Sequence, residues 1–273
     1  MRKQTSRAGF TLIELIIVLL VMASLAALVV PTLGFVKDQS DTALSANGAQ
    51  GVLNNLEQYK VAFGNYPDGF DTLVDESGAF HSRVFNIGGT VPYGTVAPGG
   101  GAGFAHYWMS MGAGMRQVAV HDSTNTGLDS DPNVPGVLVP LDGSINLMVM
   151  EPGHVPATPS FSPKEGLIIA ACFPTQADPA VPVVPAGHTL VFLGVGATNT
   201  AVGNTMTSAP LAPEKSGSDT SQYDRFIAVF DVSPGGATNR GRADLKLVLD
   251  PEFNVVARNV DFYQGTREDG TGR

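Results

Sequence analysis

The stretch GFTLIEL, residues Gly9–Leu15, opens the most apolar part of this chain and decides how the rest can be organised. From Phe10 to Val30 almost every side chain is apolar, and Glu14 is the one charged residue. An α-helix rises about 1.5 Å per residue, so this run is long enough to cross a bilayer core of about 30 Å. The sequence therefore predicts a transmembrane helix at residues 10–30.

The residues that flank and interrupt this run indicate its orientation and a function. Arg2, Lys3 and Arg7 precede it, which predicts that the N-terminal tip stays on the cytoplasmic side of the membrane. A carboxylate inside an apolar span is costly to bury and usually serves a function. Glu14 is therefore a candidate functional residue.

The order of a short basic leader, Gly9, Phe10, the TLIEL stretch and an apolar helix resembles the N-terminus of type IV pilins and type II secretion pseudopilins. The resemblance implies that a prepilin peptidase cleaves after Gly9 and methylates the new N-terminal Phe10. It implies that Glu14 acts in assembly and that Pro31 kinks the helix. The implied partners are the peptidase, an assembly platform in the inner membrane, and other pilin-like subunits, including further copies of this chain.

The residues also support an assembly role by themselves. Cleavage after Gly9 would leave the α-amino group of Phe10 as a cation near neutral pH. Pairing with Glu14, in the same chain or in a neighbour, would reduce the cost of burying both charges. The alternative is an ordinary secretory signal, for which Ser24–Ala26 offers small residues at a cleavage position. The length of the apolar run and the presence of Glu14 argue against that alternative.

Composition limits the remaining possibilities. The chain has 273 residues, of which 43% are hydrophobic and 15% are charged, with 32 glycines and 19 prolines. This composition favours short strands joined by turns and long loops. The net charge is −9, so unaided nucleic-acid binding is not expected. Cys172 is the single cysteine, which excludes an intramolecular disulfide and moves the resemblance toward the pseudopilins.

A second helical pattern follows Pro31. Val52, Leu56, Tyr59 and Phe63 recur at spacings of four, three and four residues, which predicts an amphipathic continuation over residues 31–63. One long helix from Phe10 to Phe63, bent near Pro31, is therefore expected. Its second half should lie on a head domain.

The helix should stop at Gly64, which can adopt the left-handed conformation that ends a helix, before Pro67 blocks continuation. The Leu56-x-x-Tyr59 end, the Gly64-Asn-Tyr-Pro67 segment and the following Leu73 resemble the G-type major pseudopilin of type II secretion. In that family a smaller head follows. Residues 80–220 are therefore expected to be a large elaboration of it.

The predicted fold class is α+β, with the long N-terminal helix packed on a mainly antiparallel, β-rich head at residues 64–263. A flexible tail is predicted at residues 264–273 and loops at residues 174–185 and 199–221. Alternation and turn signals predict the strands at 83–87, 106–110, 117–121, 136–141, 145–150, 167–173, 189–194, 225–232, 245–249 and 255–260.

Few residues of the predicted head are candidates for catalysis or metal binding. The five histidines never occur at metal-ligand spacing, and no nucleophile–base or phosphate-binding motif is evident, so an enzyme is not expected. Asp129, Asp131 and Asn133 alternate as calcium-loop ligands do, although the glycine and distal glutamate of an EF-hand are missing. G-type pseudopilins bind calcium in a head loop, so calcium is the one cofactor that the resemblance suggests. Asp219 and Asp224 form a second candidate, and solvated acidic turns are the alternative for both.

Together these features predict a pilin-like structural subunit, held by one span in a bacterial inner membrane with its head outside the cytoplasm. It would assemble into a type II secretion pseudopilus or a type IV pilus-like filament. Two alternatives stay open. One is a membrane-anchored binding protein that does not polymerise, and the other is an exported enzyme with an ordinary signal peptide.

The leader makes a direct prediction about the mature chain. The protein isolated from its native host should begin at N-methylated Phe10, because Gly9 is the only glycine before the apolar run. Intact-mass measurement and N-terminal sequencing check this. A mature chain that begins at Ala27, or one that retains Met1, would contradict it.

Overall fold

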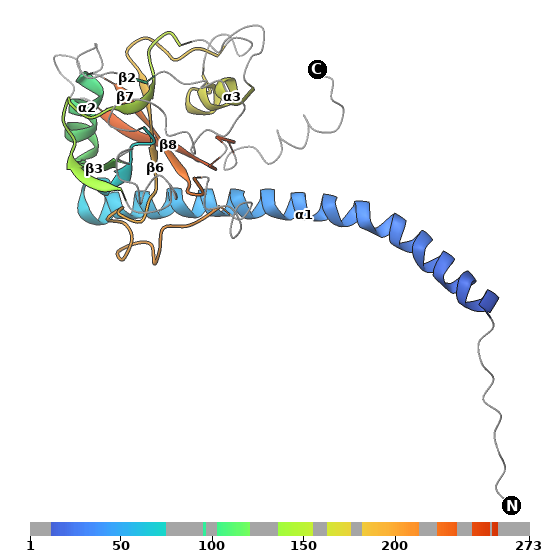
Figure 1. Ribbon diagram of the computed structural model, residues 1–273. Helices are drawn as coiled ribbons and strands as arrows, with labels where there is room; N and C mark the ends of the chain where they lie inside the picture. The colour runs from blue at the N-terminus through green and yellow to red at the C-terminus, as the bar shows by residue number, and fades with distance from the viewer. Residues whose placement is uncertain are drawn as a thin grey trace, which may run out of the picture. The chain divides into compact units, whose positions relative to one another are not determined.

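The computed structural model describes residues 12–74, 95–96, 103–120, 136–154, 163–175, 182–212, 223–233, 242–251 and 253–255. Side chains at 26–39, 41–42, 95–96, 103–104 and 163–164 are outside this description. The chain divides into two compact units, Met1–Ala43 and Leu44–Arg273. Within the described residues the fold is α+β and its head is dominated by a sheet (Figure 1), as predicted.

Helix α1 runs without interruption from Leu12 to Phe63. Pro31 lies inside this helix and does not end it. The kink predicted at Pro31 stays a prediction. Among the described residues, no helix combines the length and the apolar character needed to span a membrane. The helix stops where the sequence predicts: Gly64 has φ +79°, and its N–H donates to the Lys60 carbonyl at 2.8 Å.

The described strands form one mostly antiparallel sheet of eight strands. The first four are β1 (Phe70–Asp71), β2 (Thr95–Val96), β3 (Gln117–Val120) and β4 (Val137–Pro140). The others are β5 (Leu147–Met150), β6 (Thr189–Gly194), β7 (Ile227–Ser233) and β8 (Arg242–Leu249). The order is β2-β5-β6-β1-β3-β4, with β7 paired to β6 and β8 paired to β7. Only the β1–β3 pairing is parallel among these.

Alternate residues of the central strands supply two separate cores. On β6, Val191 and Leu193 belong to the first core, whereas Leu190 and Phe192 belong to the second. Because side chains alternate between the two faces of a strand, the sheet separates the cores. A strand that is buried on both faces needs cover on both sides.

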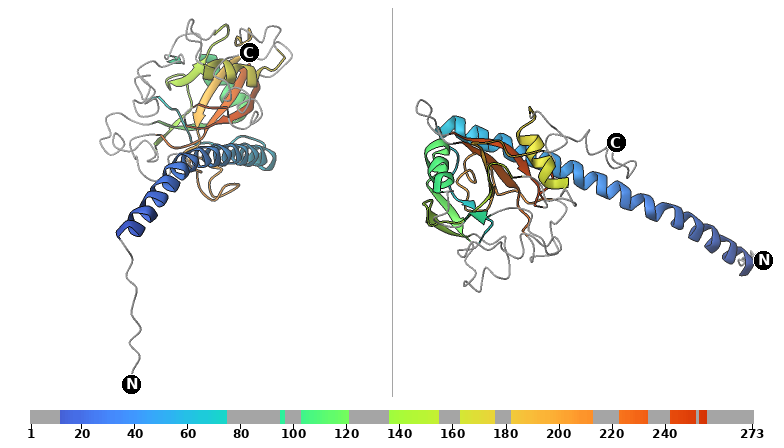
Figure 2. Two further views of the ribbon diagram at one scale, coloured as in Figure 1. Left: turned by 90° about the vertical axis from the view of Figure 1, so that its right-hand side faces the viewer. Right: turned by 90° about the horizontal axis from the view of Figure 1, so that it is seen from above.

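Helices provide that cover. Ala49, Val52 and Leu56 of α1 join the first core, together with α2 (Gly103–Trp108) and the π-helical turn η1 (Met109–Ala113). Helix α3 (Pro163–Cys172) contributes Ile168, Ile169 and Cys172 to the second core. In both Figure 1 and Figure 2 the strands lie between α2 and α3.

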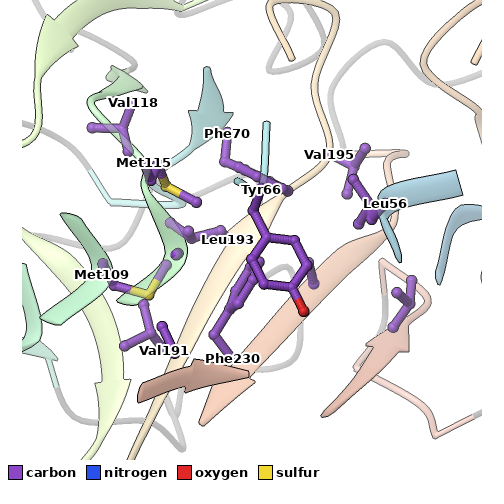
Figure 3. Close-up of a cluster of buried hydrophobic side chains, with 14 of the residues drawn as sticks. Leu56, Tyr66, Phe70, Met109, Met115, Val118, Val191, Leu193, Val195 and Phe230 are labelled. Atoms are coloured by element: carbon purple, nitrogen blue, oxygen red, sulfur yellow. The ribbon is translucent and has the colours of Figure 1, made fainter. Parts of the chain in front are cut away.

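Aromatic packing closes the first core around the residues that follow α1. The rings of Tyr66 and Phe70 meet the Phe230 ring edge-on, with centroids 5.1 Å and 5.6 Å away (Figure 3). Gly48 of α1 allows close packing there, because a Cβ atom at that position would lie 2.7 Å from the Phe226 ring. The predicted stripe holds for Val52 and Leu56, but Phe63 is 54% exposed and stacks on Tyr59 instead.

Two predicted strands are wrong. Residues 106–110 lie in α2 and η1, and residues 167–173 lie largely in α3. A short apolar run is compatible with a strand or a buried helix, so periodicity could not separate the two. Pro163 at the first helical position was the local signal for α3. The strand predicted at 83–87 lies outside the described residues, as does nearly all of the one at 255–260.

A carboxylate is buried in the middle of this sheet. Asp71 of β1 is 3% exposed, and it accepts a hydrogen bond from the Tyr223 hydroxyl at 2.8 Å. Gly194 and Gly196 make room for this pair, since a Cβ at either position would overlap the phenol or the carboxylate. Burial raises the pKa of Asp71 to about 7, although Tyr223 and Arg225 act in the opposite direction.

This shift predicts that the head loses stability as the pH rises. The native chain keeps a proton on Asp71 that the unfolded chain releases above its ordinary pKa of 3.8. The contribution is complete below that value and is lost as the pH rises through 7. Asp71→Asn should remove a dependence on the order of 4 kcal/mol. Urea unfolding of the full chain in detergent, followed by Trp108 fluorescence from pH 4 to 8, measures it. A constant difference between variant and wild type across this range would contradict the assignment.

Candidate assembly site

The first described turns of α1 form an apolar surface that is exposed on every side. Leu12 and Ile13 are 77% and 66% exposed, and exposure continues through Leu20 at 68% to Leu25 at 57%. A helix that is apolar all round is the type found buried in a membrane or in a large packed core. This surface therefore has the chemistry of a segment that lipid or other helices must cover.

Polar groups are rare on this surface. The Ser24 hydroxyl donates to the Val21 carbonyl at 2.8 Å, so its hydrogen bond is made inside the helix. Glu14 lies in the first turn of the described helix, where the helix dipole favours a negative charge. Glu14 is thus the charged group at the start of an apolar helix, as the sequence predicts.

The other predicted site residues lie elsewhere. Gly9 and Phe10 are outside the described residues, so cleavage and methylation stay predictions. Asp129, Asp131, Asn133 and Asp219 are outside them as well. Asp224 is described: it is 7% exposed, and its carbonyl accepts a hydrogen bond from the Ala212 N–H at 2.8 Å just before β7.

The described histidines serve the packing of the head. The ring of buried His106 contacts the Ile145 carbonyl, while His154 and His188 pair with Glu165 and Asp231. Within the described part of the chain, no three His, Cys, Asp or Glu side chains gather closely enough to hold a metal ion. His81 and His121 lie outside it.

Sequence reasoning missed a polar clamp at the C-terminal end of α1. The buried Tyr66 hydroxyl donates to Glu57 at 2.6 Å and accepts from Lys60 at 3.0 Å. It also accepts from the Leu245 N–H of β8 at 3.2 Å. Burial first, and then Glu57, raise the pKa of Tyr66 well above its ordinary value. The phenol stays protonated and joins the last turns of α1 to the sheet.

A second set of bonds holds the segment after the helix. The Asp68 carboxylate accepts from the N–H groups of Arg116 and Gln117 at 2.5 Å and 3.3 Å. The Asp68 N–H donates to the Thr200 hydroxyl, and the Thr200 N–H donates to the Asp68 carbonyl, both at 2.9 Å. The Tyr66-Pro67-Asp68 sequence after the helix stop was the only local signal for these contacts.

Comparison with known proteins identifies related sequences. Residues 4–30 match the family described as "Prokaryotic N-terminal methylation motif". The chain is 31% identical to type II secretion system core protein G of Aeromonas hydrophila over 107 residues, which cover 34% of this chain and 75% of that protein. The protein of the same name from Pseudomonas aeruginosa is 28% identical over 48% of this chain and 96% of its own length. The one from Escherichia coli (strain K12) is 33% identical over 28% of this chain and 54% of its own length.

No solved structure gives a significant match to this chain. The chain belongs to the type II secretion system core protein G family of pseudopilins. The resemblance drawn from Gly9–Leu15 and from the Gly64–Pro67 segment is thereby confirmed.

Proposed function

We propose that this chain is a structural subunit that is stored in the membrane by residues 10–30. It is cut after Gly9, methylated on Phe10, and assembled through α1 into a type II secretion pseudopilus or a related pilus-like filament. The observation that carries the proposal is the all-round apolar surface of α1 with Glu14 in its first turn.

The physics of that surface favours two environments in turn. In a bilayer the apolar side chains are covered by lipid, and in a filament they are covered by the helices of other copies. The cationic amine of a cleaved Phe10 and the carboxylate of Glu14 would form an ion pair that lowers the cost of burying either charge. Pairing between neighbours would also set the position of one helix along the next.

Orientation and partners follow from charge. The basic leader, with Arg2, Lys3 and Arg7, faces the cytoplasm, so a prepilin peptidase of the inner membrane can reach Gly9. The head then lies outside the cytoplasm. The net charge of −9 makes a nucleic acid an unsuitable partner. The partners proposed are the peptidase, an assembly platform, and other pilin-like subunits.

Calcium binding by the head is a separate proposal that rests on sequence alone. Asp129, Asp131 and Asn133 would supply oxygen ligands in one loop, and Asp219 with Asp224 in another. A cation there would offset the repulsion between acidic side chains, and binding to the folded state alone would stabilise it.

The full chain in detergent should therefore melt at a higher temperature with millimolar calcium than with chelator. At a hundredfold excess over the dissociation constant the stabilisation would be about 2.7 kcal/mol. Asp131→Ala should abolish the difference if the first loop binds the ion, and Asp224→Ala if the second does. Equal melting curves with calcium and chelator would leave Asp129, Asp131 and Asn133 as ordinary solvated turn residues.

The assembly proposal is tested at Glu14. Glu14→Leu should be cleaved and inserted normally but should be depleted from sheared filaments by a hundredfold or more. The reason is that an unpaired buried charge costs about 3–5 kcal/mol. Ser24→Ala is the matched control, because the hydroxyl that it removes donates to the Val21 carbonyl of the same helix.

Shear fractionation with quantitative immunoblotting provides the measurement. Wild-type incorporation of the Glu14→Leu chain would show that the carboxylate has no assembly role. If wild-type protein is processed but never enters a sheared filament, the chain is instead a membrane-anchored head that does not polymerise.

A further inference from the structure

Helix α3 is a short cover over the second core. It has ten residues, and its own Ile168, Ile169 and Cys172 are at most 5% exposed where they pack into the second core. Isolated helices shorter than about 12 residues are marginal in water, so packing and end contacts must hold α3 in place. The contacts at the two ends of α3 therefore determine under which conditions the helix stays packed on the second core.

A histidine–carboxylate pair holds the first turn of α3. The Glu165 side chain is 3% exposed, and its Oε2 lies 3.3 Å from Nε2 of His154, whose side chain is 24% exposed. Burial raises the pKa of Glu165, and the imidazole of His154 lowers it. Among the described residues, His154 is the charged group that acts on this carboxylate. The nearby Glu151 contributes a backbone carbonyl, which accepts the His154 N–H at 3.0 Å.

The other end of α3 is built differently. The His188 ring meets the Phe173 ring, which follows α3, with centroids 5.2 Å apart. Nδ1 of His188 lies 2.9 Å from Asp231 of β7, and Lys246 of β8 lies 3.2 Å from the same carboxylate. Asp231 therefore keeps a cationic partner when His188 is neutral. Within the described part of the chain, Glu165 does not keep one when His154 is neutral.

We propose that His154 and Glu165 form a pH-controlled latch, which holds α3 closed while His154 is protonated and lets it open when His154 loses its proton. Histidine is the side chain whose charge ordinarily changes between pH 5 and 8. When the imidazole is neutral, the buried Glu165 carboxylate is left without a counter-charge among the described residues. An uncompensated buried charge weakens the hold on the first turn of α3. Opening then uncovers the apolar side chains of the second core.

Cys172 provides a built-in probe of this opening. It is the only cysteine of the chain, it is the last residue of α3, and it is 5% exposed. A thiol reagent labels Cys172 of the full chain in detergent. Because the thiolate is the reactive form, the labelling rate at each pH is compared with that of the unfolded chain at the same pH. The ratio of the two rates is a protection factor. Loss of a charge-assisted hydrogen bond should lower it about tenfold between pH 5.5 and 7.5.

The single tryptophan separates local from global opening. Trp108 packs against the first core, so its emission should stay constant while Cys172 becomes reactive. If Cys172 is labelled after α3 alone has opened, the labelling rate should not depend on low concentrations of urea. If it is labelled after complete unfolding, the rate should rise with urea.

Three variants define the outcome. In His154→Gln, the protection factor of Cys172 should be low at both pH values. In Glu165→Gln it should be high at both, because that variant buries no charge beneath the first turn of α3. His188→Gln is the matched control and should keep the wild-type drop, since Lys246 still pairs with Asp231. A wild-type protection factor that is constant from pH 5.5 to 7.5 would overturn the proposal. So would a Glu165→Gln chain that keeps the wild-type drop, even if His154→Gln failed to fold.

Discussion

The burial of β6 and β7 on both faces is the constraint on which the head depends. Val191 faces one core and Phe192 the other, so neither face of these strands can be left to water. Leu190–Leu193 are fully buried, and full burial of one large apolar side chain is worth about 1.5–3 kcal/mol. The helices therefore have to cover both sides: α1, α2 and η1 on the first, and α3 on the second. A single layer of helices would leave half of this apolar surface exposed.

The exposure of the apolar side chains of α1 changes along the helix, so its two parts suit different surroundings. Over residues 12–25 its apolar side chains are exposed all round, which suits lipid or neighbouring helices. In the second unit only one face is buried, through residues such as Val52 and Leu56, and Tyr66 joins the end of the helix to β8. The proposed assembly function uses the first part. The second part anchors the head to the same helix.

Buried carboxylates make this head sensitive to protons in two places. Asp71 lies within the sheet and has the Tyr223 hydroxyl as its hydrogen-bond partner, whereas Glu165 lies under a short helix and has His154. Both are ionisable groups that water would otherwise solvate, and each is tolerated in the interior because a polar partner lies within reach. A higher pH weakens the structure at Asp71 by ionising it, and the proposed latch places a dependence of the same sign at the His154–Glu165 pair.

Local signals in the sequence determined the N-terminal motif, the helix stop at Gly64 and strands such as β5 and β6, because each depends on neighbours along the chain. The role proposed for Glu14 rests on the same short stretch. The sequence could not assign residues 167–173, since an apolar run of that length suits a helix or a strand until its packing partner is known. Tertiary structure alone brought Asp71 to Tyr223, 152 residues away, and Tyr66 to Leu245, 179 residues away. Those contacts depend on sheet order, and sheet order is set by which faces must be buried together rather than by any local pattern.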